Sequence, residues 1–199
     1  MHAQRLGALA VTCIVMGVGC DVGHASEVAA TPRDVSAVSA DDADMMMKKK
    51  AAMAAEADWK QTMAERGSDG APDAQRCRVD GHALGGFDPV SYHAGEPLRG
   101  AAGLAAEHDG VTYVFATAEN RDRFVAEPER FVPRYAGWCA MSLALGAFVC
   151  PDYENYQIEG GELLLFETTV FTNGRTLWNQ DPERHRADAD RNFRAGEAR

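Results

Sequence analysis

The sequence predicts an α+β fold: a small single domain of β-hairpins packed with short helices, preceded by a signal peptide, a tether and one longer helix. Two hairpin signals carry this prediction. Val111 to Phe115 alternates β-branched and aromatic residues directly after Asp109-Gly110, and Gly160-Gly161 separates two further apolar runs. A two-residue loop that contains Gly between such runs is typical of a hairpin. Segments with capping residues lie between and after the hairpins, and the sequence shows no evident internal repeat.

Residues 1–19 have the organisation of a signal peptide. One basic residue, Arg5, precedes an apolar run over residues 6–18 that is too short to span a bilayer. Small residues then lead to Cys20, as in the bacterial lipobox before an acylated cysteine, although Gly17 stands where Leu or Val is usual. We therefore predict cleavage before Cys20 and its lipidation. The alternative is an ordinary signal peptide that is cleaved a few residues later.

Residues 20–75 are predicted to be a tether that contains a helix. Residues 21–40 are rich in Ala, Ser, Val, Thr and Asp without periodicity, a composition typical of a flexible linker. Residues 41–66 lack Gly and Pro, begin with aspartates that favour a helix N-terminus, and are followed by Gly67. The apolar residues of this helix form no clean stripe, so we expect it to be only marginally stable alone.

The folded domain is predicted over residues 77–195. In its first half, Asp88 is interpreted as the cap of a helical turn that begins at Pro89, and Thr117 as the cap of a helix through Glu127. A second helix, over residues 138–145, ends at Gly146, and a final helix starts at Asp181-Pro182 and runs to about Phe193, with His185 on a solvated face. The expected strands are 79–83, 105–108, 111–115, 156–158 and 163–166, with a turn at Asn173-Gly174.

The charge balance argues against one class of partner. The 199 residues include 20 basic and 30 acidic side chains, a net charge of −10. An acidic surface repels the phosphates of nucleic acid, so we expect no nucleic-acid partner. The sequence also lacks a nucleophile elbow, a zinc-protease motif, a phosphate-binding glycine loop and a C-x-x-C pair. We therefore predict a protein that is not an enzyme.

Several motifs occur in a characteristic order. They are Gly86-Phe87-Asp88-Pro89-Val90-Ser91-Tyr92, residues 109–116, Pro128-Glu129-Arg130-Phe131, Tyr135-Ala136-Gly137-Trp138-Cys139-Ala140, and a tail with Trp178, Asp181-Pro182, Ala189-Asp190 and Phe193. This order resembles the YHS domain family, in particular its bacterial envelope branch, over residues 85–195. The resemblance implies an α+β fold and a location on the periplasmic side of the cell envelope. Asp21 after Cys20 also resembles the signal that keeps lipoproteins on the inner membrane.

Cys139 is the leading candidate for a metal ligand. It lies at the start of a predicted helix, where the helix dipole lowers the pKa of a thiol and favours the thiolate that binds soft metals such as Cu(I). Met141 and His93 are candidate further ligands. YHS domains attached to metal transporters carry three cysteines where this chain has Ser91, Ala116 and Asn120, so the resemblance implies the fold more than the metal site. A buried structural cysteine is the alternative interpretation of Cys139.

A run of methionines and lysines near the N-terminus also has two interpretations. Met45-Met46-Met47 is followed by Lys48-Lys49-Lys50 in the predicted helix 41–66. Thioethers suit copper, but methionine is also a good helix former and three in succession cannot share one face.

Three cysteines remain in the domain, an odd number for an oxidising compartment. The spacing alone allows either Cys77–Cys150 or Cys139–Cys150. In the resemblance, Cys139 belongs to the family motif and the other two look like additions, which implies that Cys77 pairs with Cys150 and leaves Cys139 free.

We therefore expect an exported, lipid-anchored, non-enzymatic envelope protein that binds a soft metal such as copper, with the membrane and an envelope protein as partners. The alternatives are a protein–protein interaction module, in which the helix 41–66 docks on the partner, and a thiol redox protein that uses Cys139 and Cys150.

Overall fold

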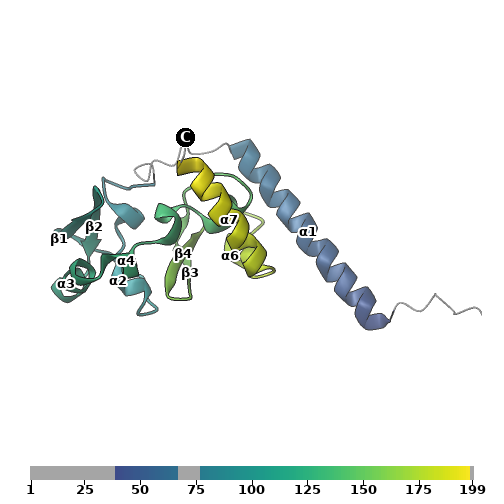
Figure 1. The fold of residues 1–199 in the computed structure, drawn as a ribbon, viewed down its shortest axis with the longest axis horizontal. Coiled ribbons are helices and arrows are strands. Elements are labelled where there is room, and N and C mark those ends of the chain that lie inside the picture. Colours follow the sequence, from purple (N-terminus) through teal and green to yellow (C-terminus); the bar gives the residue numbers. More distant parts are fainter. Residues whose placement is uncertain (1–38, 67–76, 198–199) are drawn as a thin grey trace, which may run out of the picture. The chain divides into compact units, whose positions relative to one another are not determined.

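The computed structural model describes residues 39–66 and 77–197 (Figure 1). The predicted signal peptide, Cys20 and the linker over residues 21–38 lie outside the described residues. The elements in chain order are α1 (Ala40–Arg66), the 3₁₀ helix η1 (Ala83–Gly86), α2 (Pro89–Tyr92), β1 (Ala101–His108), β2 (Val111–Phe115), α3 (Ala118–Ala126), α4 (Pro128–Phe131), the 3₁₀ helix η2 (Arg134–Gly137), α5 (Ala140–Ala144), β3 (Asp152–Glu159), β4 (Glu162–Phe166), α6 (Gly174–Trp178) and α7 (Pro182–Glu197).

The predicted α+β class is confirmed, since short helices surround two antiparallel two-stranded sheets, β1–β2 and β3–β4. Thr117 caps α3 by accepting a hydrogen bond from the backbone of Asn120, as expected. The strand predicted over residues 79–83 is wrong: Val79 and His82 form a single bridge before η1. The turn predicted at Asn173-Gly174 is also wrong, because the Asn173 side chain caps α6.

The described domain contains an internal repeat that was not evident in the sequence. In the first hairpin Ala101 pairs with Phe115, and 51 positions later Asp152 pairs with Phe166. All the remaining residue pairs of the first hairpin also recur 51 positions later in the second. The register irregularity after the first pair recurs at the same place. We call residues 82–131 the first repeat and residues 133–185 the second repeat.

The turns that precede the two hairpins repeat as well. Leu84 and Gly85 in η1 have φ of 54° and 57°, and Tyr135 and Ala136 in η2 have φ of 61° and 51°. Left-handed geometry is rare for residues other than glycine, so its recurrence at equivalent positions indicates one backbone design used twice. At Gly85 a side chain would also collide with the ring of Tyr153.

Each repeat has a core of its own, and β4 contributes to both. Leu163 and Leu165 pack with the first repeat, whereas Leu164 and Phe166 pack with the second. Successive side chains of a strand point to opposite faces, so a single strand can close two cores. The strand β4 therefore joins the two repeats into one domain.

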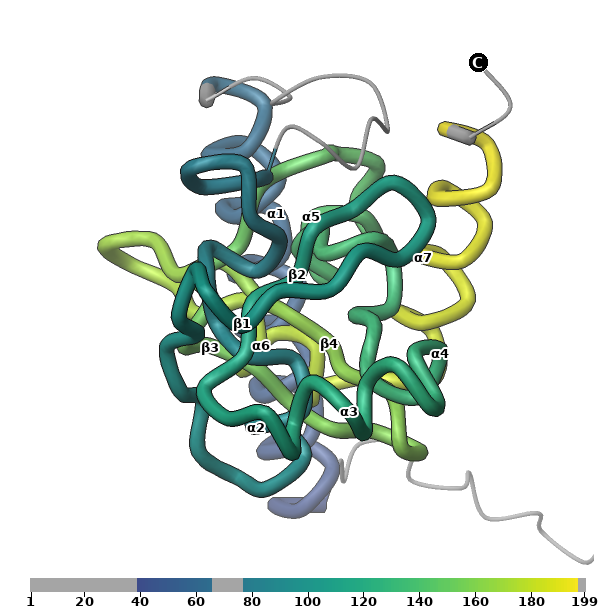
Figure 2. Tube along the Cα trace, turned by 90° about the vertical axis from the view of Figure 1, so that its left-hand side faces the viewer, coloured from purple at the N-terminus to yellow at the C-terminus, as the bar shows by residue number. Residues whose placement is uncertain are grey.

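The last helix, α7, covers the second core beside α5 (Figure 2). The residues of the tail motif pack inside the domain: Trp178 and Ala189 are buried, Asp190 pairs with Arg134 and accepts a hydrogen bond from the Tyr135 hydroxyl, and Phe193 contacts the Tyr135 ring. The expectation of a solvated His185 is wrong. Its ring is completely buried beside Trp178 and Glu56, because α1 covers this face of α7.

The helix α1 is docked at one end only. Trp59 and Met63 are buried in the second core, and Glu56 pairs with Arg184 of α7. By contrast, residues 39–51 are all exposed, and this part of α1 extends away from the other elements in Figure 1. The C-terminal half of α1 thus belongs to the packed domain, although the sequence pattern placed it in the tether. Among the described residues, no helix has the length and apolar character needed to cross a membrane.

Candidate functional site

The two repeats place a polar cap residue at the same point, immediately before a short helix. Asp88 precedes α2 in the first repeat, and Cys139 precedes α5 in the second. The backbone N–H of each donates to an equivalent carbonyl: Asp88 to Leu98 at 2.8 Å and Cys139 to Val149 at 3.0 Å. Cys139, the candidate metal ligand, therefore occupies in the second repeat the position that the buried Asp88 occupies in the first.

Asp88 is completely buried, and its carboxylate accepts three hydrogen bonds. Its Oδ1 accepts from the Val90 backbone at 2.8 Å, and its Oδ2 accepts from the Ala116 backbone at 2.9 Å and from Asn120 Nδ2 at 2.7 Å. These donors come from α2, from the end of β2 and from α3. The interpretation of Asp88 as a cap is confirmed, and its carboxylate also joins three elements of the first repeat.

Ser91, Ala116 and Asn120, the three positions that the sequence comparison set against cysteines, all lie around Asp88. Ser91 donates its hydroxyl hydrogen to the Asp88 carbonyl at 2.7 Å, and Ala116 and Asn120 donate to the Asp88 carboxylate. All three positions therefore surround one residue. In this chain they supply hydrogen-bond donors and no thiolate.

Cys139 accepts hydrogen bonds in a similar arrangement. Its Sγ accepts from the Ser142 backbone at 3.4 Å, from the Ser142 hydroxyl at 3.2 Å and from the Glu167 backbone at 3.2 Å. Glu167 in the second repeat lies 51 positions after Ala116 in the first, so the backbone donor at the end of the strand is conserved between the repeats. The sulfur thus takes the place of the carboxylate oxygens.

The expectation that helix geometry lowers the pKa of Cys139 is wrong. Burial raises the pKa of this thiol, and the hydrogen bonds from Ser142 and Glu167 oppose that rise without cancelling it. The side chain is completely buried, and α5 has only five residues, so desolvation of the thiolate outweighs the helix dipole. Cys139 is consequently a neutral thiol near pH 7.

The other candidate ligands lie in different surroundings. Met141 is buried in the same core as Cys139, whereas the ring of His93 lies edge-on to Phe131 in the first repeat, 5.3 Å between centroids. Burial lowers the pKa of His93, and the charges of Arg130 and Arg123 lower it further. Within residues 39–66 and 77–197, no group of three or more His, Cys, Asp or Glu side chains is arranged to hold a metal ion.

The cysteines at the edges of this site are joined. Cys77 and Cys150 form a disulfide with a Cα–Cα distance of 5.3 Å, the pairing that the resemblance implied, and Cys139 is a buried free thiol. The bond links the segment before the first repeat to the segment before β3. A redox reaction between Cys139 and Cys150 would first require the release of Cys77.

No family model, curated protein or solved structure matches this chain. The equivalence of Asp88 and Cys139 therefore rests on the geometry alone. A signal for it was present in the sequence, since Gly86 and Ser91 recur 51 positions later as Gly137 and Ser142. The low identity between the repeats concealed it.

Proposed function

We propose that this chain is an exported, lipid-anchored, non-enzymatic protein of the bacterial cell envelope, similar to the YHS domain family. It acts on the periplasmic side of the inner membrane as a binding module for another envelope component. The domain carries the binding surface, and Cys20 carries the anchor.

The observation that carries this proposal is the Cys77–Cys150 disulfide, because such bonds persist in exported proteins and are rare in the reducing cytosol. The lipobox-like sequence before Cys20 supports the anchor. The use of Asp88, Cys139, Trp178 and Asp190 in internal packing supports a role without catalysis, since each of these motif residues is engaged by neighbours within the domain.

The anchor is tested by metabolic labelling of a bacterial host with a clickable fatty acid. We expect the wild-type chain to incorporate the label and to fractionate with membranes, and the Cys20→Ala variant to remain unlabelled. The Cys139→Ala variant is the matched control and should label like the wild type. If wild type and Cys20→Ala are equally unlabelled and both are soluble, the anchor is disproved while export stays open.

Soft-metal binding through Cys139 is a second proposal. The surroundings of the thiol determine what such binding would cost. A Cu(I) ion must bind the thiolate, so it has to displace a proton from a thiol whose pKa is raised by burial and compete with three hydrogen-bond donors. The expected signature is therefore weak uptake at neutral pH that strengthens as the pH rises.

This proposal is tested by titrating Cu(I) into the reduced protein against a competing chelator at several pH values. We expect uptake by the wild type and its loss in Cys139→Ser, with circular dichroism to verify that the variant is folded. His93→Ala and Met141→Leu report on the two further ligands. Equal uptake by wild type and Cys139→Ser would remove Cys139 from the site.

A further inference from the structure

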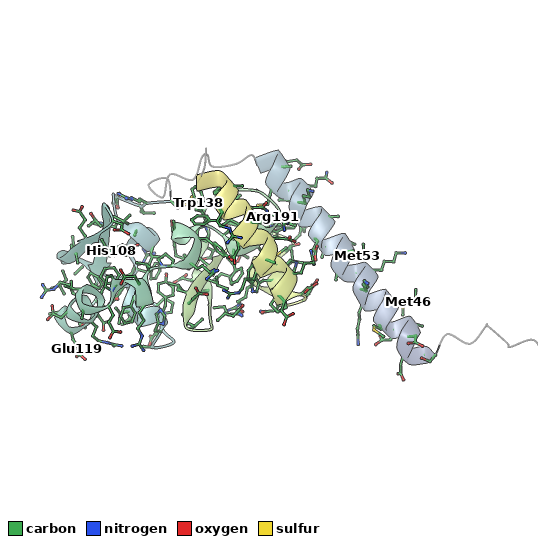
Figure 3. All side chains as sticks on the ribbon, in the orientation of Figure 1. Met46, Met53, His108, Glu119, Trp138 and Arg191 are labelled. Carbon is green, nitrogen blue, oxygen red and sulfur yellow. A yellow bond between two sulfur atoms is a disulfide. The ribbon has the colours of Figure 1, made fainter. Side chains whose placement is uncertain are left out.

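The helix α1 exposes several large apolar side chains among its charged residues. The methionines of this helix that lie outside the core are 62% to 68% exposed: Met45, Met46, Met47 and Met53. Figure 3 shows Met46 and Met53 on the part of α1 that extends beyond the other elements. Clustered large apolar side chains of this kind mark an interaction surface.

Part of this surface forms one stripe with an ordered charge pattern. Met45 and Met46 each lie three or four residues from both Asp42 and Lys49, and Met53 follows Lys49 by four residues, so these five residues share a face of the helix. We call these five residues the α1 seam. Along the seam, the acidic Asp42 comes first, the Met45-Met46 pair is next, and the basic Lys49 follows the pair. Met47 is equally exposed but points to a different side.

The seam borders an open groove of about 1090 Å³. Met45, Lys49 and Met53 line it from α1, and Gln180, Asp181 and Arg184 line it from the start of α7. A groove between one helix and the end of another can receive a third helix.

We propose that the α1 seam binds the same seam of a second copy of this chain in antiparallel orientation, with the two-fold axis between Met45 and Met46. In this register Asp42 of each copy faces Lys49 of the other, and Asp41 faces Lys50. The methionine pairs meet in the centre. A two-fold interface must be self-complementary, and the acidic–apolar–basic order meets that requirement. A parallel pair would instead oppose like charges.

The basic side chains are available for this pairing, and the exposed Asp42 carboxylate accepts only a hydrogen bond from the Ser39 hydroxyl at 2.7 Å among the described residues. Lys48 forms an ion pair with Asp44 within the helix at 2.7 Å, whereas Lys49 and Lys50 have no ion-pair partner among the described residues. Asp42 and Lys49 lie seven residues apart, about 10 Å along the helix axis. Both ion pairs therefore fit within one short interface.

The geometry leaves room for the second copy. Packing against the domain begins at Ala55, and residues 39–51 are exposed. In the antiparallel register the two domains therefore lie at opposite ends of the helix pair. The paired segments are about 18 Å long, so the interface is smaller than the ~1,200 Å² of a stable complex, and the dimer is weak and favoured by high local concentration.

Site-directed disulfide formation tests the proposal on the full chain, in a background with Cys13→Ser and Cys20→Ser that also removes the lipid anchor. In the proposed register the two copies of residue 46 lie about 1.5 Å apart along the axis, within reach of a disulfide. We expect mild oxidation to shift Met46→Cys from the monomer to the dimer mass on a non-reducing gel.

Two matched variants on the same helix give the control. Met47→Cys is equally exposed but points away from the seam, and in Met53→Cys the two thiols would be about 22 Å apart. Both should remain monomeric. Failure of Met46→Cys to dimerise, or equal dimerisation of all three variants, overturns the proposal.

A charge exchange tests the ion pairs without new thiols. Replacing Asp41, Asp42 and Asp44 by Lys, or Lys48, Lys49 and Lys50 by Glu, should abolish self-association in each variant in sedimentation experiments. Mixing the two variants should restore a heterodimer. Self-association that survives in either variant alone contradicts the pairing.

The lipid surface is the other occupant that this helix could have, and the test separates it. If Met46→Cys stays monomeric and the same chain co-sediments with phosphatidylglycerol vesicles through Lys48–Lys50, the seam faces a membrane and the second copy is excluded.

Discussion

Asp88→Ala is expected to lower the free energy of unfolding by about 3–5 kcal/mol, because it leaves one buried and two part-buried donors without an acceptor, at about 1–3 kcal/mol each. The donors are the backbone N–H groups of Val90 and Ala116 and the side-chain amide of Asn120. Since they belong to three elements, we expect the whole first repeat to loosen. Urea unfolding followed by circular dichroism measures the loss.

Two further variants make the result specific. Asp88→Asn keeps one oxygen for Val90 but presents N–H groups toward the other donors, so its loss should be smaller than that of alanine. Asp122→Ala removes an exposed carboxylate on α3 and should change stability by less than about 0.5 kcal/mol. Equal stability of Asp88→Ala and Asp122→Ala would contradict the role assigned to Asp88.

Loss of the Cys77–Cys150 bond is expected to cost about 4 kcal/mol, the chain-entropy value for a loop of this size. The bond joins residues 73 positions apart, so it restricts the unfolded chain over the whole first repeat and about the first third of the second. The double variant Cys77→Ser/Cys150→Ser should therefore unfold at a much lower urea concentration than the wild type.

A reductant provides the internal control for this experiment. Dithiothreitol should lower the stability of the wild type to that of the double variant and leave the double variant unchanged, because Cys139 has no disulfide to lose. A wild type whose stability is the same with and without reductant would show that the bond does not form or does not stabilise.

Local patterns in the sequence predicted the hairpins and most helices correctly. Val111–Phe115 is a strand because its residue types, its alternation and the preceding Asp-Gly turn all favour one. The strand predicted over residues 79–83 failed because Asp80 and Gly81 have left-handed geometry, with φ of 52° and 79°, and form a tight turn that brings Val79 and His82 together.

The candidate site was predictable only in part. The cap role of Asp88 followed from the proline after it, but the partners Ala116 and Asn120 are about 30 residues away and come together only through the fold. For Cys139, position at a helix start suggested a reactive thiolate. Burial decides the outcome instead, and burial depends on the packing of β4, α6 and α7 around Cys139.

The exposed half of α1 could not be separated from the docked half because Trp59 was the only local signal.

Thiol mapping of the protein recovered from a host envelope tests most directly the claim that this is an exported domain with a structural cysteine at its centre. The sample is alkylated without reductant, before and after unfolding, and its peptides are analysed by mass spectrometry. We predict a linked Cys77–Cys150 peptide, and a Cys139 that reacts only after unfolding because its side chain is buried and its thiol is neutral. A linked Cys139–Cys150 peptide, or a Cys139 that is alkylated in the native protein, would contradict this account.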